Sequence, residues 1–205
     1  MSDTRLFAGS VLAIGIAVLG GWAIYTGSAP GAARAAEDGP GPNLVIEVGG
    51  ATTGTIVIDL LSDVAPKHVA QITALAEEGA YDGVVFHRVI DGFMAQTGDV
   101  SNGKQGGDIS AAGTGGSTRP NLAAEFSSLP FDRGTVGMAR SQDPDSANSQ
   151  FFIMFAPAPH LDGQYTVVGQ VIQGMDVVDA IKKGSEAENG LVTEPDYMVK
   201  VTVQK

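Results

Sequence analysis

Two segments of the sequence bring polar side chains together with large apolar ones. Residues 86–99 read FHRVIDGFMAQTGD, and residues 137–155 read GMARSQDPDSANSQFFIMF. Arg88 in the first segment stays protonated and offers its hydrogen-bond donors in a rigid planar fork. Gln96 and Gln150 add amide groups that both donate and accept. An apolar floor with a guanidinium and amides at its edge is what a site that recognises proline requires.

Strand periodicity predicts which of these side chains share a face, because alternate residues of extended backbone point to the same side. In the first strand, Phe86, Arg88 and Ile90 are predicted to share one face, with His87 and Val89 on the opposite face. After the Asp91-Gly92 break, Met94 and Gln96 are predicted to share a face. In the second segment, Gln150 and Phe152 share one face, with Phe151 and Ile153 on the other. Each strand therefore carries polar groups next to large apolar ones on a single side.

Composition and spacing argue against other chemistries. The chain has no cysteine, which excludes thiol nucleophiles, zinc–thiolate sites and disulfides. His68, His87 and His160 have no short metal-ligand spacing, and we expect no metal or other cofactor. The glycine-rich stretch 103–116 lacks the G-K-[ST] ending of a phosphate loop, and no nucleophile-elbow motif supports a serine hydrolase. A net charge of −11 and the lack of a basic stripe disfavour nucleic-acid binding.

The elements that must position these residues are short segments separated by turn residues, beginning at Asn43. Two helices are expected, 66–78 and 175–182. The eight expected strands are 44–48, 55–60, 84–90, 93–97, 135–139, 150–155, 166–172 and 198–203. Without a βαβ alternation, this order predicts a mainly β fold: a closed eight-stranded antiparallel barrel capped by two α-helices.

The first expected helix has clear boundary signals. Pro66 suits the first turn, Ser62 and Asp63 offer capping oxygens, and Gly79 is a natural stop. Its predicted buried face is Val69, Ile72, Leu75 and Ala76.

The N-terminal sequence is typical of an export signal. An uncharged apolar run covers residues 6–25 after Arg5, and a small-residue linker reaches residue 42. The run is long for a signal peptide and long enough to span a bilayer, while Ala33-Arg34-Ala35 matches an A-x-A cleavage site. Both readings stay open: residues 1–35 are a signal peptide or a membrane anchor, 36–42 a linker and 43–205 the folded domain. The domain is expected outside the cytoplasmic membrane, in the periplasm.

From Leu44 to the C-terminus, the order of these motifs resembles the cyclophilin family of peptidyl-prolyl cis-trans isomerases. The two segments above, the Gly113–Gly116 loop, the Leu161-Asp162-Gly163 turn and the second helix occur in the family's order. The resemblance implies the eight-stranded barrel, with the site on its outer surface, and makes Arg88 the catalytic residue. The substrate-binding residues that it implies are Phe93, Met94, Gln96, Ala139, Arg140, Gln150, Phe152, His160, Leu161 and Tyr165.

Three positions depart from the best-known eukaryotic pattern. Tyr165 replaces a histidine and Arg140 an asparagine, as in the bacterial branch. His160 stands where a tryptophan normally donates a hydrogen bond to cyclosporin, which predicts weak inhibition by that drug.

The expected function is isomerisation of X-Pro bonds during the folding of exported proteins. The alternative is a non-catalytic module that uses the same groove to hold proline-containing segments as a chaperone. The expected partners are proline-containing polypeptides, with the membrane contacted only through an uncleaved N-terminal segment. The protein is expected to be a monomer.

Overall fold

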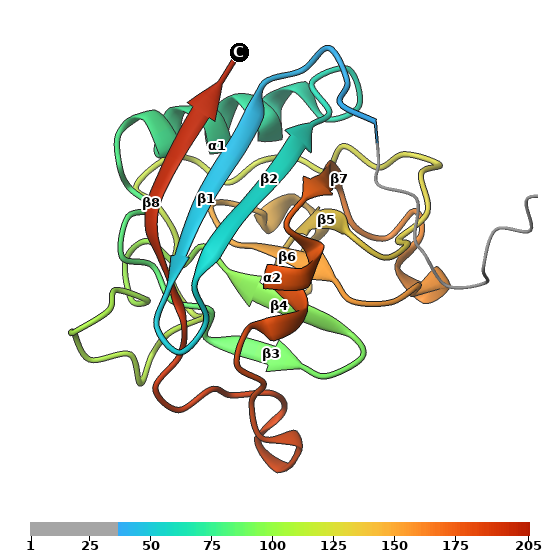
Figure 1. Ribbon diagram of the computed structural model, residues 1–205. Coiled ribbons are helices and arrows are strands. Elements are labelled where there is room, and N and C mark those ends of the chain that lie inside the picture. Colours follow the sequence, from blue (N-terminus) through green and yellow to red (C-terminus); the bar gives the residue numbers. More distant parts are fainter. Residues whose placement is uncertain (1–36) are drawn as a thin grey trace, which may run out of the picture. The chain divides into compact units, whose positions relative to one another are not determined.

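A computed structural model describes residues 37–205 of the chain (Figure 1). The expected signal peptide or anchor at residues 6–25, and the A-x-A pattern at 33–35, lie outside the described residues. Within residues 37–205, no helix has both the length and the apolar character needed to cross a bilayer.

All eight expected strands are present in one antiparallel sheet. They are β1 (Asn43–Gly49), β2 (Gly54–Leu60), β3 (Arg88–Ile90), β4 (Met94–Thr97), β5 (Thr135–Met138), β6 (Phe151–Met154), β7 (Val167–Gln173) and β8 (Tyr197–Gln204). Their order across the sheet is β3-β4-β6-β5-β7-β2-β1-β8. The glycine-rich turn between β1 and β2 forms the expected hairpin.

The expectation of a closed barrel is not confirmed, because the strand order is open and the sheet curls into a half-barrel. Its edges are β3 and β8. The residues just before β3 approach β8 through isolated contacts, such as the bridge between Val85 and Tyr197. The expected strand 84–90 therefore shortens to Arg88–Ile90, and its first half runs along β8 without a continuous ladder.

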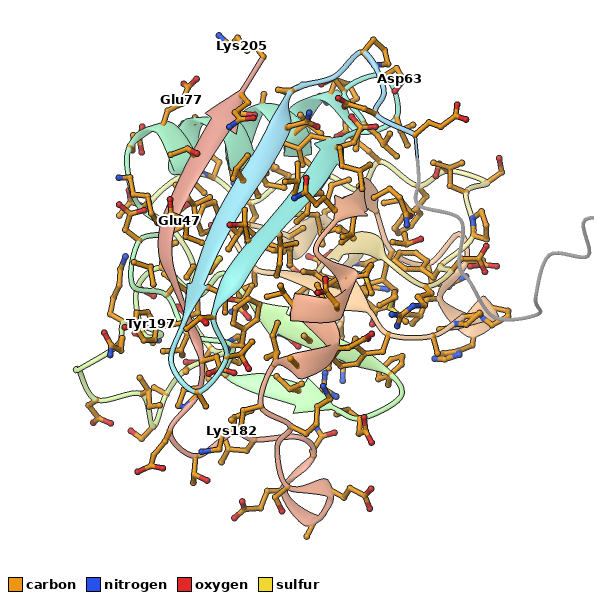
Figure 2. All side chains as sticks on the ribbon, in the orientation of Figure 1. Glu47, Asp63, Glu77, Lys182, Tyr197 and Lys205 are labelled. Carbon is orange, nitrogen blue, oxygen red and sulfur yellow. The ribbon has the colours of Figure 1, made fainter. Side chains whose placement is uncertain are left out.

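Side chains on the two faces of the sheet form two apolar clusters. The main core holds the inward residues, including Phe151 and Ile153. A second cluster lies on the opposite face of β4 and β6 and includes Met94 and Phe152. The predicted alternation is thus confirmed for β6. Figure 2 shows charged side chains at the periphery, among them Glu77 and Asp63.

The predicted grouping of Phe86 with Arg88 and Ile90 is wrong. Phe86 is fully buried in the main core together with Val89, whereas Ile90 packs against the second cluster. The regular strand begins only at Arg88, so the two-residue alternation does not extend back to Phe86.

Helix α1 (Pro66–Glu77) lies beside β8 and begins with Pro66, as expected (Figure 1). Val69, Ile72, Leu75 and Ala76 form its buried face, and Gly79 follows its end with a φ of 70°. The prediction that Ser62 or Asp63 caps the helix is wrong. The residue before the helix is Ala65, and no neighbouring side chain hydrogen-bonds to the first turn.

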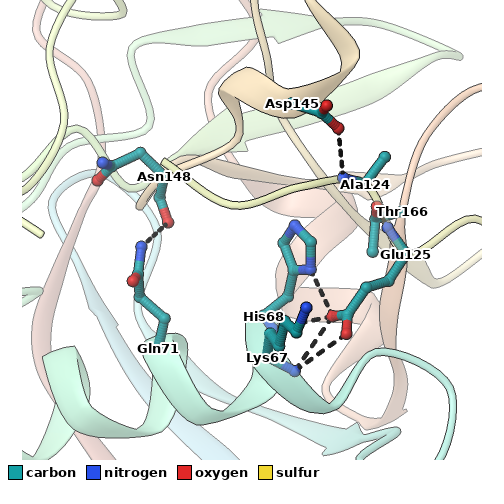
Figure 3. Close-up of polar contacts among 8 residues, drawn as sticks. All are labelled: Lys67, His68, Gln71, Ala124, Glu125, Asp145, Asn148 and Thr166. Atoms are coloured by element: carbon teal, nitrogen blue, oxygen red, sulfur yellow. Dashed lines mark hydrogen bonds and ion pairs between the residues drawn. The ribbon is translucent and has the colours of Figure 1, made fainter. Parts of the chain in front are cut away.

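A carboxylate from far along the chain caps α1 instead (Figure 3). Glu125 accepts hydrogen bonds from the backbone N–H groups of Lys67 (3.1 Å) and His68 (3.1 Å). Its Oε2 also lies 2.6 Å from Nδ1 of the buried His68. A negative charge at this end of a helix satisfies free N–H groups and complements the helix dipole.

Helix α2 (Met175–Ala180) contacts β2 and ends two residues before the predicted Lys182. Ile181 leaves the helical conformation with ψ of 132°, and the N–H of Lys182 donates to the buried carboxylate of Asp196 at 2.9 Å. This bond takes the N–H that a further helical turn would have used.

Candidate active site

Ten of the eleven predicted site residues line one cavity of about 370 Å³, on the face of the sheet that carries the second cluster. They are Arg88, Phe93, Met94, Gln96, Ala139, Arg140, Phe152, His160, Leu161 and Tyr165. The eleventh, Gln150, lines an adjoining cavity of about 500 Å³ with the loop around Gly113–Ser117. Gln96, Ala139 and Arg140 border both cavities, which therefore form one continuous groove.

Arg88 is half-buried in the lining of this groove, and its guanidinium contacts three oxygen acceptors and the sulfur of Met94, which lies 3.9 Å from Nη1. Nη1 donates to Oε1 of Gln96 at 3.2 Å, from the position directly opposite on β4. Nε donates to the backbone carbonyl of Asn189 at 3.0 Å, and Nη2 to its Oδ1 at 3.1 Å. Burial lowers the pKa of Arg88, an effect that nearby Tyr165 opposes. The group nevertheless stays protonated at any ordinary pH, because a guanidinium is a very strong base.

Asn189 was not among the predicted site residues. The dipeptide Asn189-Gly190 is a turn signal in the sequence. Nothing in that signal indicates that the turn, which is 101 residues away, meets Arg88.

The amides of Gln96 and Gln150 extend the contacts of Arg88 along the groove. Nε2 of Gln96 donates to Oε1 of Gln150 at 3.0 Å, and Nε2 of Gln150 donates to the carbonyl of Gly115 at 2.7 Å. A continuous series of hydrogen bonds thus links β3, β4 and the glycine-rich loop.

Aromatic side chains form the floor of the first cavity. Phe152 stacks on Phe131 with ring centroids 5.7 Å apart, and Tyr165 meets both rings edge-on. Phe93 stacks on His160 at 5.9 Å. Phe131 was not predicted, because its position in the sequence carries no strand pattern. In the structure it is buried and stacks on Phe152. The floor of the cavity is therefore made of buried aromatic rings, which suits an apolar ligand.

Arg140 lies on the wall between the two cavities. Its guanidinium stacks over the ring of Tyr165 at 4.4 Å from the centroid. Nη2 also donates to the carbonyl of Gln164 at 2.8 Å, and Nη1 to that of Ser141 at 2.9 Å. These contacts join the segments after β5 and before β7.

Asp99, a fully buried carboxylate that was also not predicted, holds the glycine-rich loop. Oδ2 accepts from the N–H groups of Gly113 and Gly115, each at 2.8 Å, and Oδ1 from those of Asn102 (2.9 Å) and Ser101 (3.2 Å). Burial would raise the pKa of Asp99, but these hydrogen bonds outweigh it and lower the pKa. The carboxylate therefore fixes the loop that Gln150 contacts.

Of the three histidines, His160 lines the groove, whereas His68 and His87 line neither of its two cavities. His87 is buried, and burial lowers its pKa to about 4. It is therefore neutral at pH 7. Among the described residues, no cluster of three or more His, Cys, Asp or Glu side chains is arranged to hold a metal ion.

Comparisons with known proteins point to one family. The sequence profile described as "Cyclophilin type peptidyl-prolyl cis-trans isomerase/CLD" matches residues 44–203. A "Probable peptidyl-prolyl cis-trans isomerase" of Brucella suis is 65% identical over 153 residues, which cover 74% of this chain and 78% of the relative. A peptidyl-prolyl cis-trans isomerase of Helicobacter pylori is 39% identical over 140 residues, covering 66% of this chain and 79% of the relative.

Solved structures share the fold. A cyclophilin from Hirschia baltica superposes with a TM-score of 0.66 at 26% identity, covering 80% of this chain and 74% of its own. A cyclophilin-type isomerase of Cryptosporidium parvum, crystallised in the presence of the dipeptide Ala-Pro, gives a TM-score of 0.67 at 24% identity. That match covers 80% of this chain and 99% of the other.

Proposed function

The chain belongs to the cyclophilin-type peptidyl-prolyl cis-trans isomerases, and from that premise we propose which residues carry the reaction and where it takes place. The enzyme accelerates rotation about X-Pro peptide bonds. We assign the catalytic role to Arg88 and substrate binding to the other residues of the groove, on proline-containing segments of unfolded or flexible polypeptides.

The reaction requires no bond to break. Delocalisation of the nitrogen lone pair into the carbonyl gives the amide a rotation barrier of ~18–20 kcal/mol. A hydrogen-bond donor near the prolyl nitrogen draws the lone pair back to nitrogen, and it binds the twisted state more strongly than the planar one. Lowering the barrier by about 7 kcal/mol corresponds to roughly 10⁵-fold in rate. A positioned guanidinium can supply this donor without any proton transfer.

The contacts of Arg88 carry the assignment. Its guanidinium borders the aromatic cavity and is held in one orientation by Gln96 and Asn189. The floor around Phe152 would grip the proline ring while the carbonyl side rotates. Gln96, Gln150 and the backbone of Ala139 and Arg140 would hold the flanking peptide.

Proline-limited refolding of a test protein, measured with wild type and Arg88→Ala, tests the assignment. We expect wild type to speed the slow phase catalytically and the variant to lose about 10²–10³-fold, the usual cost of removing one transition-state donor. The matched control is Arg133→Ala, which removes an arginine that pairs with Asp179 and donates to the carbonyl of Phe155 but lines neither cavity of the groove. Full activity in Arg88→Ala would overturn the role of Arg88. Binding of proline peptides without catalysis by wild type would favour the chaperone alternative.

We further propose that the domain acts outside the cytoplasmic membrane, as a monomer that assists the folding of exported proteins. The support is the apolar run 6–25 behind Arg5, followed by a small-residue linker. Cell fractionation and N-terminal sequencing test this: a chain starting at Ala36 in the periplasm indicates cleavage, and an intact chain in the membrane fraction indicates an anchor. Recovery in the cytoplasm would contradict export, and a sedimentation mass above that of one chain would contradict the monomer.

A further inference from the structure

Asn189 presents two acceptors to one guanidinium. Its backbone carbonyl and its side-chain Oδ1 accept from Nε and Nη2 of Arg88, at 3.0 and 3.1 Å. This is possible because Asn189 has a left-handed backbone, with φ of 53°. Apart from glycine, asparagine and aspartate are among the residues that adopt this conformation most readily.

The loop that carries Asn189 is fastened to the edge strand that carries Arg88. The N–H of Val89 donates to the carbonyl of Gly190 at 2.8 Å, and the N–H of Gly184 donates to the carbonyl of Val89 at 2.9 Å. Gly184 and Gly190 pack so closely that a Cβ on Gly184 would lie 1.9 Å from the carbonyl oxygen of Gly190. Asn189 therefore has a fixed position relative to the backbone of Arg88.

The acceptors around Arg88 are all neutral. Each of its three nitrogens donates to an amide oxygen, from Gln96 or Asn189. Across residues 37–205, no carboxylate forms an ion pair with Arg88. Amide oxygens fix the direction of the fork while leaving its full positive charge to act on a bound amide. A carboxylate at the same place would hold the fork more strongly but would cancel part of that charge.

We propose that Asn189 is a positioning residue for the isomerase reaction, and that its neutrality is as necessary as its hydrogen bonds. The inference rests on the proposed catalytic role of Arg88. Asn189 orients the guanidinium of Arg88 toward the cavity. Because Asn189 is a neutral amide, the positive charge of the guanidinium remains available to interact with the lone pair that develops on the prolyl nitrogen.

Two variants separate orientation from charge. Asn189→Gly keeps the left-handed backbone and the carbonyl acceptor but removes Oδ1, which loosens one end of the fork. Asn189→Asp keeps both acceptors and tolerates the same backbone, but it adds a negative charge next to Arg88. Both variants should fold, and urea unfolding of each checks this.

The measurements are kcat and KM for an X-Pro peptide, obtained from exchange line shapes, and the Arg88 Nη2–H resonances. We expect kcat to fall about tenfold in each variant with little change in KM, since the aromatic pocket is untouched. The Nη2–H resonances should stay sharp in Asn189→Asp and broaden in Asn189→Gly, which removes their acceptor. A purely structural role predicts that Asn189→Asp is as active as wild type, and that result would overturn the requirement for neutrality.

Wild-type kcat in Asn189→Gly would overturn the positioning role itself. These failures are distinguishable from failure of the proposed function, because Arg88→Ala is measured in parallel. If Arg88→Ala retains activity, the catalytic assignment is at fault, and the Asn189 inference falls with it. If Arg88→Ala is inactive while both Asn189 variants are fully active, the inference alone is wrong.

Discussion

Replacing Asp99 with asparagine should destabilise the protein by more than its conservative chemistry suggests. The carboxylate is fully buried and accepts hydrogen bonds at both oxygens. An asparagine can accept at one oxygen, so its NH₂ group must face N–H groups. In the orientation that keeps the bonds to Ser101 and Asn102, the N–H groups of Gly113 and Gly115 lose their acceptor.

The expected cost follows from those two donors. A buried donor left without an acceptor costs about 1–3 kcal/mol, which gives about 2–6 kcal/mol for the pair. Water can reach the half-exposed loop and satisfy part of this demand, so we expect about 3 kcal/mol. With an m-value of about 2 kcal/mol/M, the urea midpoint should fall by about 1.5 M.

Urea unfolding followed by far-UV circular dichroism measures this change. The matched control is Asp108→Asn, an exposed aspartate of the same loop that accepts from the N–H of Ser110, and we expect it to leave the midpoint unchanged. A loss below about 1 kcal/mol in Asp99→Asn would refute the view that this carboxylate holds the loop.

The pH dependence gives a second check on Asp99. Its pKa is lower in the folded protein than in the unfolded chain, so the stability that it contributes is present above about pH 4. That contribution is lost as the pH falls through the folded pKa. The gap in stability between wild type and Asp99→Asn should therefore narrow in acid, and a constant gap would contradict the argument.

Four further outcomes are expected. Glu125→Ala should cost about 2–3 kcal/mol and lower the Tm by about 5–10 °C, because α1 loses its cap and His68 its partner; calorimetry measures this. Since the pKa of Glu125 is lowered despite its burial, its contribution should be lost below about pH 4, and persistence in acid would count against it. Gly137→Ala should cost about 1–3 kcal/mol in urea, because the new methyl group would lie 2.5–2.7 Å from the two stacked phenyl rings of the floor; an unchanged midpoint would contradict this. Cyclosporin should inhibit weakly, because His160 stands where the best-known eukaryotic cyclophilins have a tryptophan. A nanomolar inhibition constant would contradict this expectation.

The regular elements were predictable because their signals are local. Alternation and glycine turns located the eight strands, and Pro66 and Gly79 bounded α1. Two of the errors, at the ends of the helices, came where a distant group intervened. Glu125, 57 residues from His68, caps α1 in place of its own neighbours, and Asp196 takes the N–H that would have lengthened α2.

The family motifs contain the residues that line the first cavity, from Arg88 to Tyr165, so this part of the candidate site was predictable from the sequence. They did not reveal the groups that hold that lining in place. Asp99, Phe131 and Asn189 act through contacts made across the fold, and a carboxylate, a buried ring or an Asn-Gly turn looks ordinary in sequence.

The amide series in the groove has a direction, and the groups at its two ends both set it. A guanidinium can only donate, so the oxygen of Gln96 must face Arg88, which turns the NH₂ of Gln96 toward Gln150 and that of Gln150 toward the loop carbonyl. The backbone carbonyl of Gly115 can only accept, so it requires the same orientation of the Gln150 amide from the other end. The two side-chain dipoles are thus aligned from both ends. Arg88→Ala leaves the carbonyl of Gly115 in place, so that variant should lose a donor while both amides keep their orientation.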